Sequence, residues 1–367
     1  MSLPPPPIPL PHFLQTLQTA TTQTPREYKK IHGCSVRWEI DGPKGIQDTQ
    51  SLQTILTLLN GPPADELIIE ATDNEPALTF VIALSKYLYE CKGSDSDARN
   101  LLILHYPSYN DDDKSSSSIH ENEDGGFLDD DTQAEQHSMG INQHLLTYLK
   151  DPLFIGEDSN LDILLIFDSK WVHKQTELPF DPDPDPHRII EVLAATNTTT
   201  LIHQLATEIK RRQDQGYEYL EFADLMGVIH NNNTPVELDS THAVLVGVSS
   251  VTLSLQPPHP HPNSHSINPS YLPATYKSLF SVNISTHLTT EQLIDIRVLT
   301  ASLLPFAAVT LEAAYPTSTS TSNESDQSTT LLFSSAWSVF SKLKGIEGYA
   351  LLMEGVGGKV PLEFDSI

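Results

Sequence analysis

Two apolar stretches of the chain end in side chains that could do chemistry. Leu101–Leu104 leads into His105, and Ile163–Phe167 is followed by Asp168, Ser169 and Lys170. Runs of four or five apolar residues are too short for helices and too uniform for half-exposed strands, which predicts strands buried on both faces of a parallel sheet. In open α/β sheets the chemistry lies just past the carboxyl ends of such strands, so the residues at these ends are the candidate functional groups.

The elements that would position these residues alternate between strand and helix patterns, which predicts an α/β fold with right-handed crossovers and a mostly parallel sheet. Strands are predicted at Ser35–Ile40, Glu66–Ala71, Asn100–His105, Leu161–Lys170 and Ile189–Ala195, with His242–Leu255 at a sheet edge, and helices at Phe13–Thr21, Asp48–Leu59, Glu75–Tyr89, Gly140–Lys150, Leu201–Gln213 and Tyr219–His230. Asp48 is expected to cap its helix. Leu78, Ile82 and Tyr89 are expected on the core face of theirs.

Composition divides the chain into four parts. Residues 1–30 hold a proline-rich lead, Pro4–Pro11, which is not expected to be helical, and a helix. Residues 31–256 form the main domain, with an acidic loop at 110–137 that is expected to be disordered. A Pro/His linker at 257–273 precedes residues 274–367, where the order β, α, β, loop, β, α, β predicts a small α+β domain of ferredoxin-like type.

Three segments of the main domain carry a family resemblance. Leu101–Asn110 resembles the strand and loop that hold the general-base histidine of fungal caspase-like (metacaspase-related) cysteine peptidases. Leu161–Lys170 is similar to their nucleophile strand, which ends Asp-Cys-Cys or Asp-Ser-Cys. Ile189–Ala195 and Tyr219–Leu225 resemble the elements that follow, and Phe280–Trp337 contains segments like the tail of these proteins. The resemblance implies a caspase-like three-layer fold around the mostly parallel sheet.

The chain departs from the family at both catalytic positions. Alignment through Tyr106 puts Tyr109 at the general-base position, and alignment through Asp168 puts Lys170 at the nucleophile position. A phenol with a pKa of about 10 is a poor base at neutral pH, and an ammonium group of about 10.4 is no nucleophile. The sequence therefore predicts an inactive caspase-like pseudopeptidase that serves as an interaction or regulatory module.

Two other functions are weighed against this one. A divergent hydrolase could use Ser169 with a nearby histidine, such as His105 or His173, although a structural role is the favoured interpretation of His105. A nucleotide-binding protein would need a glycine-rich turn after the first strand, where Gly42 and Gly45 alone are present. The nucleotide-binding hypothesis is therefore the weakest.

Charge and composition limit partners and compartment. With 48 acidic and 21 basic residues and a net charge of -27, nucleic acid is an unfavourable partner. No apolar run is long enough to span a membrane, and the residues after Met1 do not form a signal peptide. Two cysteines, Cys34 and Cys91, fit a reducing compartment, and both are expected to be buried and inert. These observations predict a cytoplasmic protein with a protein or peptide partner and leave the oligomeric state open.

No cofactor or metal is predicted. The histidines His259, His261 and His265 lie in the Pro/His linker, and the acidic runs Asp111–Asp113 and Asp129–Asp131 lie in the acidic loop. Neither group has the spacing of a metal-binding motif.

Overall fold

The chain forms a mixed α/β protein with a mostly parallel central sheet. The computed structural model describes residues 6–21, 26–39, 42–70, 76–92, 98–107, 160–168, 188–195, 200–232, 241–247, 249–255, 276–303, 308–318, 327–343, 346 and 348–356. Two compact units are present. The central unit comprises Tyr28–Glu177 and Leu193–Thr207, and the terminal unit comprises Met1–Glu27, Leu178–Val192 and Glu208–Ile367.

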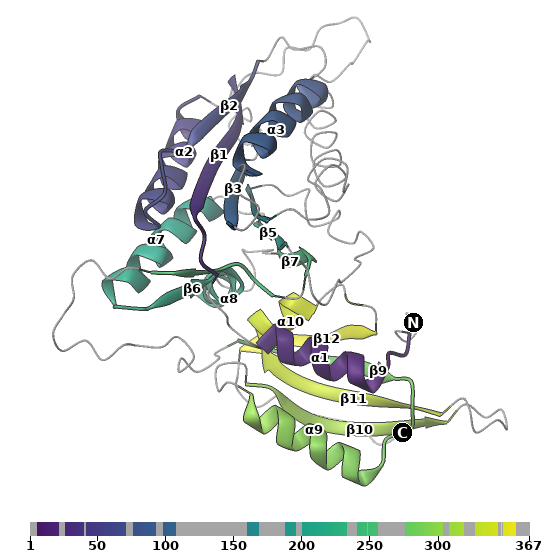
Figure 1. Cartoon of the computed structure of the whole chain (residues 1–367). Helices are drawn as coiled ribbons and strands as arrows, with labels where there is room; N and C mark the ends of the chain where they lie inside the picture. Colours follow the sequence, from purple (N-terminus) through teal and green to yellow (C-terminus); the bar gives the residue numbers. More distant parts are fainter. Residues whose placement is uncertain are drawn as a thin grey trace, which may run out of the picture. The chain divides into compact units, whose positions relative to one another are not determined.

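Among the described residues, the central unit contains four complete strands of the central sheet and the long helices α2 and α3 (Figure 1). In chain order they are β1 (Lys30–Trp38), α2 (Gly42–Leu58), β2 (Asp65–Ile69), α3 (Pro76–Lys92), β3 (Asn100–Pro107) and β4 (Leu161–Asp168). The sheet order is β2-β1-β3-β4-β5-β7, where β5 is Ile190–Ala194 and β7 is Thr241–Val246. Strand β1 pairs in parallel with β2 and β3, and β3 pairs in parallel with β4.

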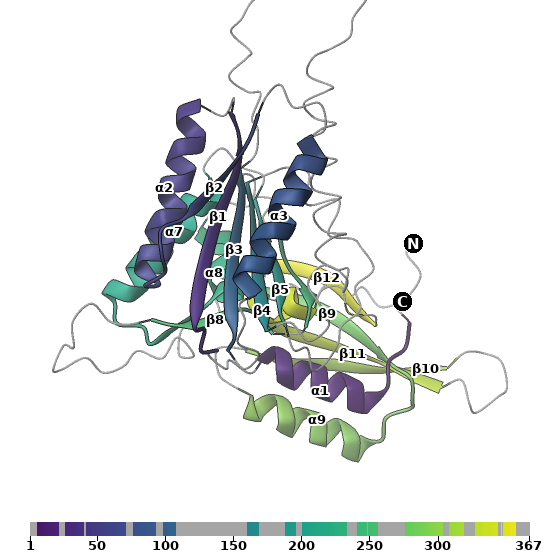
Figure 2. The ribbon, with the colours of Figure 1, turned by 45° about the horizontal axis from the view of Figure 1, so that its top comes forward.

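Strands β3 and β4 are buried on both faces, as their apolar runs predict. All eight residues of β4 and the residues 100–106 of β3 are buried. Helices α2 and α3 lie on opposite sides of these strands (Figure 2). Because successive side chains of a strand point to opposite faces, Ser35 and Cys34 of β1 face different helices.

Helix α2 packs directly on the backbone of β1. A Cβ at Gly33 would lie 2.4 Å from Leu56 Cδ1, so any larger residue here would require the buried Leu56 side chain to shift. Shortly after the end of the helix at Leu58, Asn60 is left-handed, with φ 57°, and the Gly61 N–H then donates to the Leu56 carbonyl over 2.7 Å. This cap directs the chain into β2.

The predicted core face of helix α3 is wrong. Leu78, Ile82 and Tyr89 are 51%, 61% and 82% exposed, whereas the buried residues of the helix include Phe80 and Leu84. Both faces of this helix carry apolar side chains, so a period of 3.6 residues fits either face. The structure therefore leaves a row of large apolar side chains exposed on α3.

The terminal unit is built on a four-stranded antiparallel sheet (Figure 1). Its elements in chain order are α1 (Leu10–Thr21), β6 (Tyr219–Glu221), α8 (Phe222–Asn232), β7, β8 (Thr252–Ser254), β9 (Tyr276–Ile284), α9 (Thr290–Ser302), β10 (Thr310–Ser318), β11 (Gln327–Ala336), α10 (Trp337–Leu343) and β12 (Tyr349–Val356). The sheet order is β10-β11-β9-β12, with every neighbouring pair antiparallel. Strands β6 and β8 form a separate pair.

Helix α1 completes the core of this unit. Phe13 and Leu17 are fully buried in one cluster with Phe280 and Phe333, and the rings of Phe13 and Phe333 are 5.3 Å apart. The preceding residue Ile8 donates its N–H to the Asn283 carbonyl over 2.8 Å and accepts the Ser285 N–H over 2.9 Å. The residues 10–21 are therefore an integral part of the terminal unit.

Several predicted boundaries are wrong. Helix α1 begins at Leu10 and includes Pro11, which was expected to be outside a helix, because the first turn does not need the missing N–H. Helix α2 begins at Gly42, so Asp48 is a buried helix residue and not a cap. The predicted helix Tyr219–His230 opens with β6, and the predicted long edge strand is divided into β7 and β8.

Some predicted segments lie outside the described residues. They are the helix Gly140–Lys150, the acidic loop at 110–137 and the Pro/His linker at 257–273.

Candidate functional site

The candidate residues are described in part. His105 lies on β3 and Asp168 is the last residue of β4, whereas Tyr109, Ser169 and Lys170 lie outside the described residues. In the parallel pair of β3 and β4, His105 is opposite Ile166 and Pro107 is opposite Asp168. The two strands with the catalytic motifs of the resemblance are therefore direct neighbours and end level with each other.

His105 is held between two buried partners. Its Nε2 lies 3.0 Å from Asp168 Oδ2, and its Nδ1 lies 3.3 Å from Ser35 Oγ on β1. The Thr49 hydroxyl on α2 donates to Ser35 Oγ over 3.3 Å. In the tautomer that carries its proton on Nε2, the His105 ring donates to Asp168 and accepts from Ser35. This is the structural role that the sequence favours for His105.

The other carboxylate oxygen of Asp168 binds the start of a helix. Oδ1 accepts the N–H of Leu201, the first residue of α7 (Leu201–Asp214). A carboxylate at a helix N-terminus satisfies a free N–H group and is favoured by the helix dipole. Asp168 therefore connects β3, β4 and α7 within the central unit, and its position was predicted although this role was not.

The serine, the histidine and the carboxylate are the residue types of a Ser-His-Asp catalytic triad. The serine and the histidine, however, are not accessible to a substrate. Ser35 and His105 are both fully buried. A nucleophile must reach a substrate carbonyl, so Ser35 acts here as a structural hydrogen-bonding group. Sequence analysis missed Ser35 and Thr49. No signal in the sequence indicated Ser35, because in the alternating pattern of the first strand it shares the polar side with Arg37 and Glu39.

Both cysteines of the chain are buried and free. Burial is the main cause that raises the pKa of Cys34 to about 12, and the negative charge of Asp65 adds to this increase. Burial likewise raises the pKa of Cys91 to about 12. The thiolate is the reactive form of cysteine, and at neutral pH these thiols are almost entirely protonated. The expected burial of both thiols is confirmed, and their inertness stays a prediction.

The raised thiol pKa values predict a loss of stability at alkaline pH. Because the folded protein holds these protons up to a pH of about 12 and the ordinary value is 9.0, the stabilisation is complete below pH 9 and is lost as the pH rises towards 12. Urea unfolding of the wild type and of Cys34→Ala/Cys91→Ala between pH 8 and 11 measures this effect. The wild type should lose more of its free energy of unfolding over this range, and equal losses would contradict the assignment.

A second buried polar network lies in the terminal unit and was not predicted. Glu191 of β5 accepts hydrogen bonds from His242 Nε2 and the Ser250 hydroxyl, both over 2.6 Å, and from the Val251 N–H over 2.7 Å. His242 Nδ1 lies 2.7 Å from Ser341 Oγ on α10. Glu191, His242 and Ser341 are all buried. The signal in the sequence was a single carboxylate inside an apolar strand.

An aromatic contact flanks this network. The Trp337 ring stacks on His230 of α8 at 5.0 Å and lies 6.2 Å from the His242 ring. Lys342, which follows Ser341 in α10, donates a hydrogen bond to Glu221 over 2.6 Å, and both side chains are buried. Helix α10 therefore inserts indole, hydroxyl and ammonium groups into the interior of the terminal unit.

Within the described ranges, no group of three or more His, Cys, Asp and Glu residues could hold a metal ion. The same residues include no helix with the length and apolar character needed to cross a membrane.

No protein-family model matches the sequence, and no curated protein matches it.

Proposed function

We propose that the chain is a caspase-like pseudopeptidase that acts as an interaction or regulatory module. The two strands that resemble the family's catalytic strands, β3 and β4, are parallel neighbours that end level with each other. A catalytic pair that is shared between two strand ends requires this adjacency. The flanking helices on the two sides of the sheet also support a caspase-like three-layer fold.

The main support for the proposal is that both cysteines are buried and have a raised pKa. A cysteine peptidase needs a thiolate that is stabilised by a neighbouring imidazole and can reach a peptide carbonyl. The chain has two cysteines, both buried, and burial raises the pKa of each to about 12. Neither thiol is suited to nucleophilic attack. The sequence places Tyr109 and Lys170 at the positions of the family's catalytic histidine and cysteine, which agrees with an inactive protein.

The sheet of the terminal unit supports a ferredoxin-like assignment for its C-terminal part. Strand β9 and strand β10 are joined through α9, and β11 pairs between them in antiparallel orientation. Strand β11 leads through α10 to β12, which pairs with the other side of β9. This is a split β-α-β arrangement used twice. A small domain of this kind fits a binding role.

The partner in this proposal is a protein or peptide. A net charge of -27 makes phosphate backbones unfavourable to bind. The proposed compartment is the cytoplasm, where cysteines stay reduced, as Cys34 and Cys91 are here.

A peptide-cleavage assay tests the proposal. The purified chain is incubated with fluorogenic peptides that carry Arg, Lys or Asp before the scissile bond, and with a cysteine-directed probe for caspase-like enzymes. We expect no turnover and no labelling, because neither thiol forms a thiolate at neutral pH. Labelling that disappears in Cys34→Ala or Cys91→Ala would disprove the proposal.

The same assay separates the second candidate, a divergent hydrolase that uses Ser169 and a histidine. It is favoured by one observation, the 3.0 Å contact of His105 with Asp168, which immediately precedes Ser169. Cleavage that is abolished by Ser169→Ala but kept by Ser302→Ala, an exposed serine of α9, would establish this enzyme. Silence of the wild type across all peptides would count against it.

A further inference from the structure

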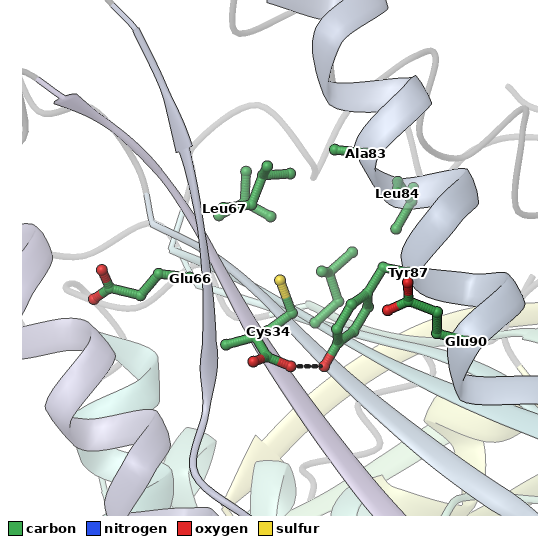
Figure 3. Close-up of a pocket in the computed structure, with 10 residues that line it drawn as sticks. Cys34, Glu66, Leu67, Ala83, Leu84, Tyr87 and Glu90 are labelled. Carbon is green, nitrogen blue, oxygen red and sulfur yellow. Dashed lines mark hydrogen bonds between the residues drawn. The ribbon is translucent and has the colours of Figure 1, made fainter.

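A cavity of about 220 Å³ lies in the central unit between the strands β1 and β2 and the helix α3 (Figure 3). It lies on the side of the sheet opposite to His105. Ser35, which contacts His105, points towards α2, whereas its neighbour Cys34 lines the cavity. The cavity is therefore separate from the candidate site at the ends of β3 and β4.

The floor of the cavity is apolar and buried. Val36, Leu84 and Leu104 line it, and each is nearly or fully buried. An apolar cavity of about 150 Å³ in a protein interior is enough to bind benzene. The larger volume here accommodates an aromatic ring with a short chain. The apolar part of a ligand would gain binding free energy by leaving water for this floor.

The mouth of the cavity is negatively charged. Asp65 and Glu90 line it and are exposed, and among the described residues no lysine or arginine forms an ion pair with either of them. The neighbouring carboxylate of Glu66 points to the other side of β2, where Arg37 lies 3.4 Å away (Figure 3). Two carboxylates above an apolar floor favour a ligand with one cationic end.

Tyr87 fixes one of these carboxylates in place. Its hydroxyl donates to Asp65 Oδ2 over 2.9 Å (Figure 3). The hydroxyl also lies 3.2 Å from the Gly33 carbonyl. The negative charge of Asp65 acts on the floor as well, where it contributes, after burial, to the raised pKa of Cys34. The negative potential that Asp65 produces at the floor and the fixed position of its carboxylate both favour a cation at the mouth of the cavity.

We propose that this cavity binds a small arylalkylammonium compound, whose aromatic body fills the apolar floor and whose ammonium group pairs with Asp65 and Glu90. The site would give the protein a ligand-binding function that is independent of any peptidase chemistry. Its specificity would come from size at the floor and from charge at the mouth.

Isothermal titration of the full chain with three compounds of one shape tests the charge requirement. They are 2-phenylethylamine, the neutral 2-phenylethanol and the anionic 3-phenylpropanoate. We expect saturable binding of one amine per chain, affinity for the alcohol that is lower by about tenfold or more, and no binding of the carboxylate. Failure of the amine to bind, or equal affinity for amine and alcohol, would overturn the proposal.

Variants of the lining test the location. Ala83→Phe places a ring in the cavity and should abolish binding of 2-phenylethylamine, and Glu90→Gln should weaken it by about tenfold. Lys86→Gln, on the same helix outside the lining, should bind as the wild type does. Should Ala83→Phe fail to fold, Glu90→Gln decides the test.

The charge change itself needs a matched control. Glu218→Gln removes one exposed negative charge from the terminal unit, so it alters the net charge as Glu90→Gln does. Equal weakening by both variants, or unchanged affinity in Glu90→Gln, would show that the amine binds elsewhere and would refute the site.

Discussion

Replacing Glu191 by alanine is expected to lower the free energy of unfolding of the terminal unit by about 3–5 kcal/mol. Glu191 is fully buried and accepts hydrogen bonds from His242, Ser250 and the Val251 N–H. Each of these donors would lose its acceptor inside the protein, and the missing side chain would leave a cavity. Few single substitutions cost this much.

Urea unfolding, followed by tryptophan fluorescence, measures this change, because Trp337 lies 6.2 Å from the His242 ring. Glu191→Gln is the graded variant. It keeps the shape and one acceptor oxygen, so its cost should lie between those of the wild type and Glu191→Ala. The exposed Glu218→Ala is the control and should leave the midpoint unchanged. A loss below about 1 kcal/mol in Glu191→Ala would mean that the network is not formed.

Replacing Lys342 by methionine is the second substitution with a large expected effect. Lys342 and Glu221 are 1% and 3% exposed, and their charged groups are 2.6 Å apart. Loss of the ammonium group leaves the Glu221 carboxylate buried without this partner, which typically costs about 3–5 kcal/mol. The stability of the terminal unit should therefore fall steeply in Lys342→Met.

A double-mutant cycle distinguishes charge from packing in this pair. Lys342→Met combined with Glu221→Gln removes both charges, and its cost should be smaller than the sum of the single costs by about 1 kcal/mol or more. Lys210→Met, at an exposed position of α7, is the matched control and should have no measurable effect. Additive costs in the cycle would argue that Lys342 contributes through packing alone.

The central sheet was largely predictable because its strands carry the strongest local signal. The run Ile163–Phe167 has no alternation and is bounded by aspartates, and β4 is buried along its whole length. Strand β5 was predicted within one residue of its observed start. Long apolar runs of this kind have few alternatives to a buried strand.

Faces and ends of helices were less predictable. Helix α3 has apolar residues on both sides, so local periodicity could not tell Leu78 and Ile82, which are exposed, from Phe80 and Leu84, which are buried. Helix α1 begins at Leu10 despite the adjacent Pro11, because its burial against Phe333 and Phe280 supplies stability that local propensity does not. Such contacts are between residues far apart in sequence.

The partners within the buried polar clusters were likewise not predictable from the sequence. His105 and Asp168 could be predicted as candidate site residues because they end apolar runs. Ser35, which contacts His105, lies on another strand and could not. The partners of Glu191 come from β7 and from the segment before β8, and His242 in turn contacts Ser341 of α10. No spacing along the chain brings these segments together. A lone carboxylate in an apolar strand signals that buried partners exist, but it does not name them.

The bridge between Ile8 and Ile284 has a consequence for biosynthesis. About three quarters of the chain lies between these residues, and α1 has its apolar side against strands β9 and β11. At about 5–20 residues per second, a ribosome would produce those strands on the order of tens of seconds after it made α1. During that interval Phe13 and Leu17 lack their native contacts, so the apolar side of the nascent helix stays uncovered until β9 and β11 have been made.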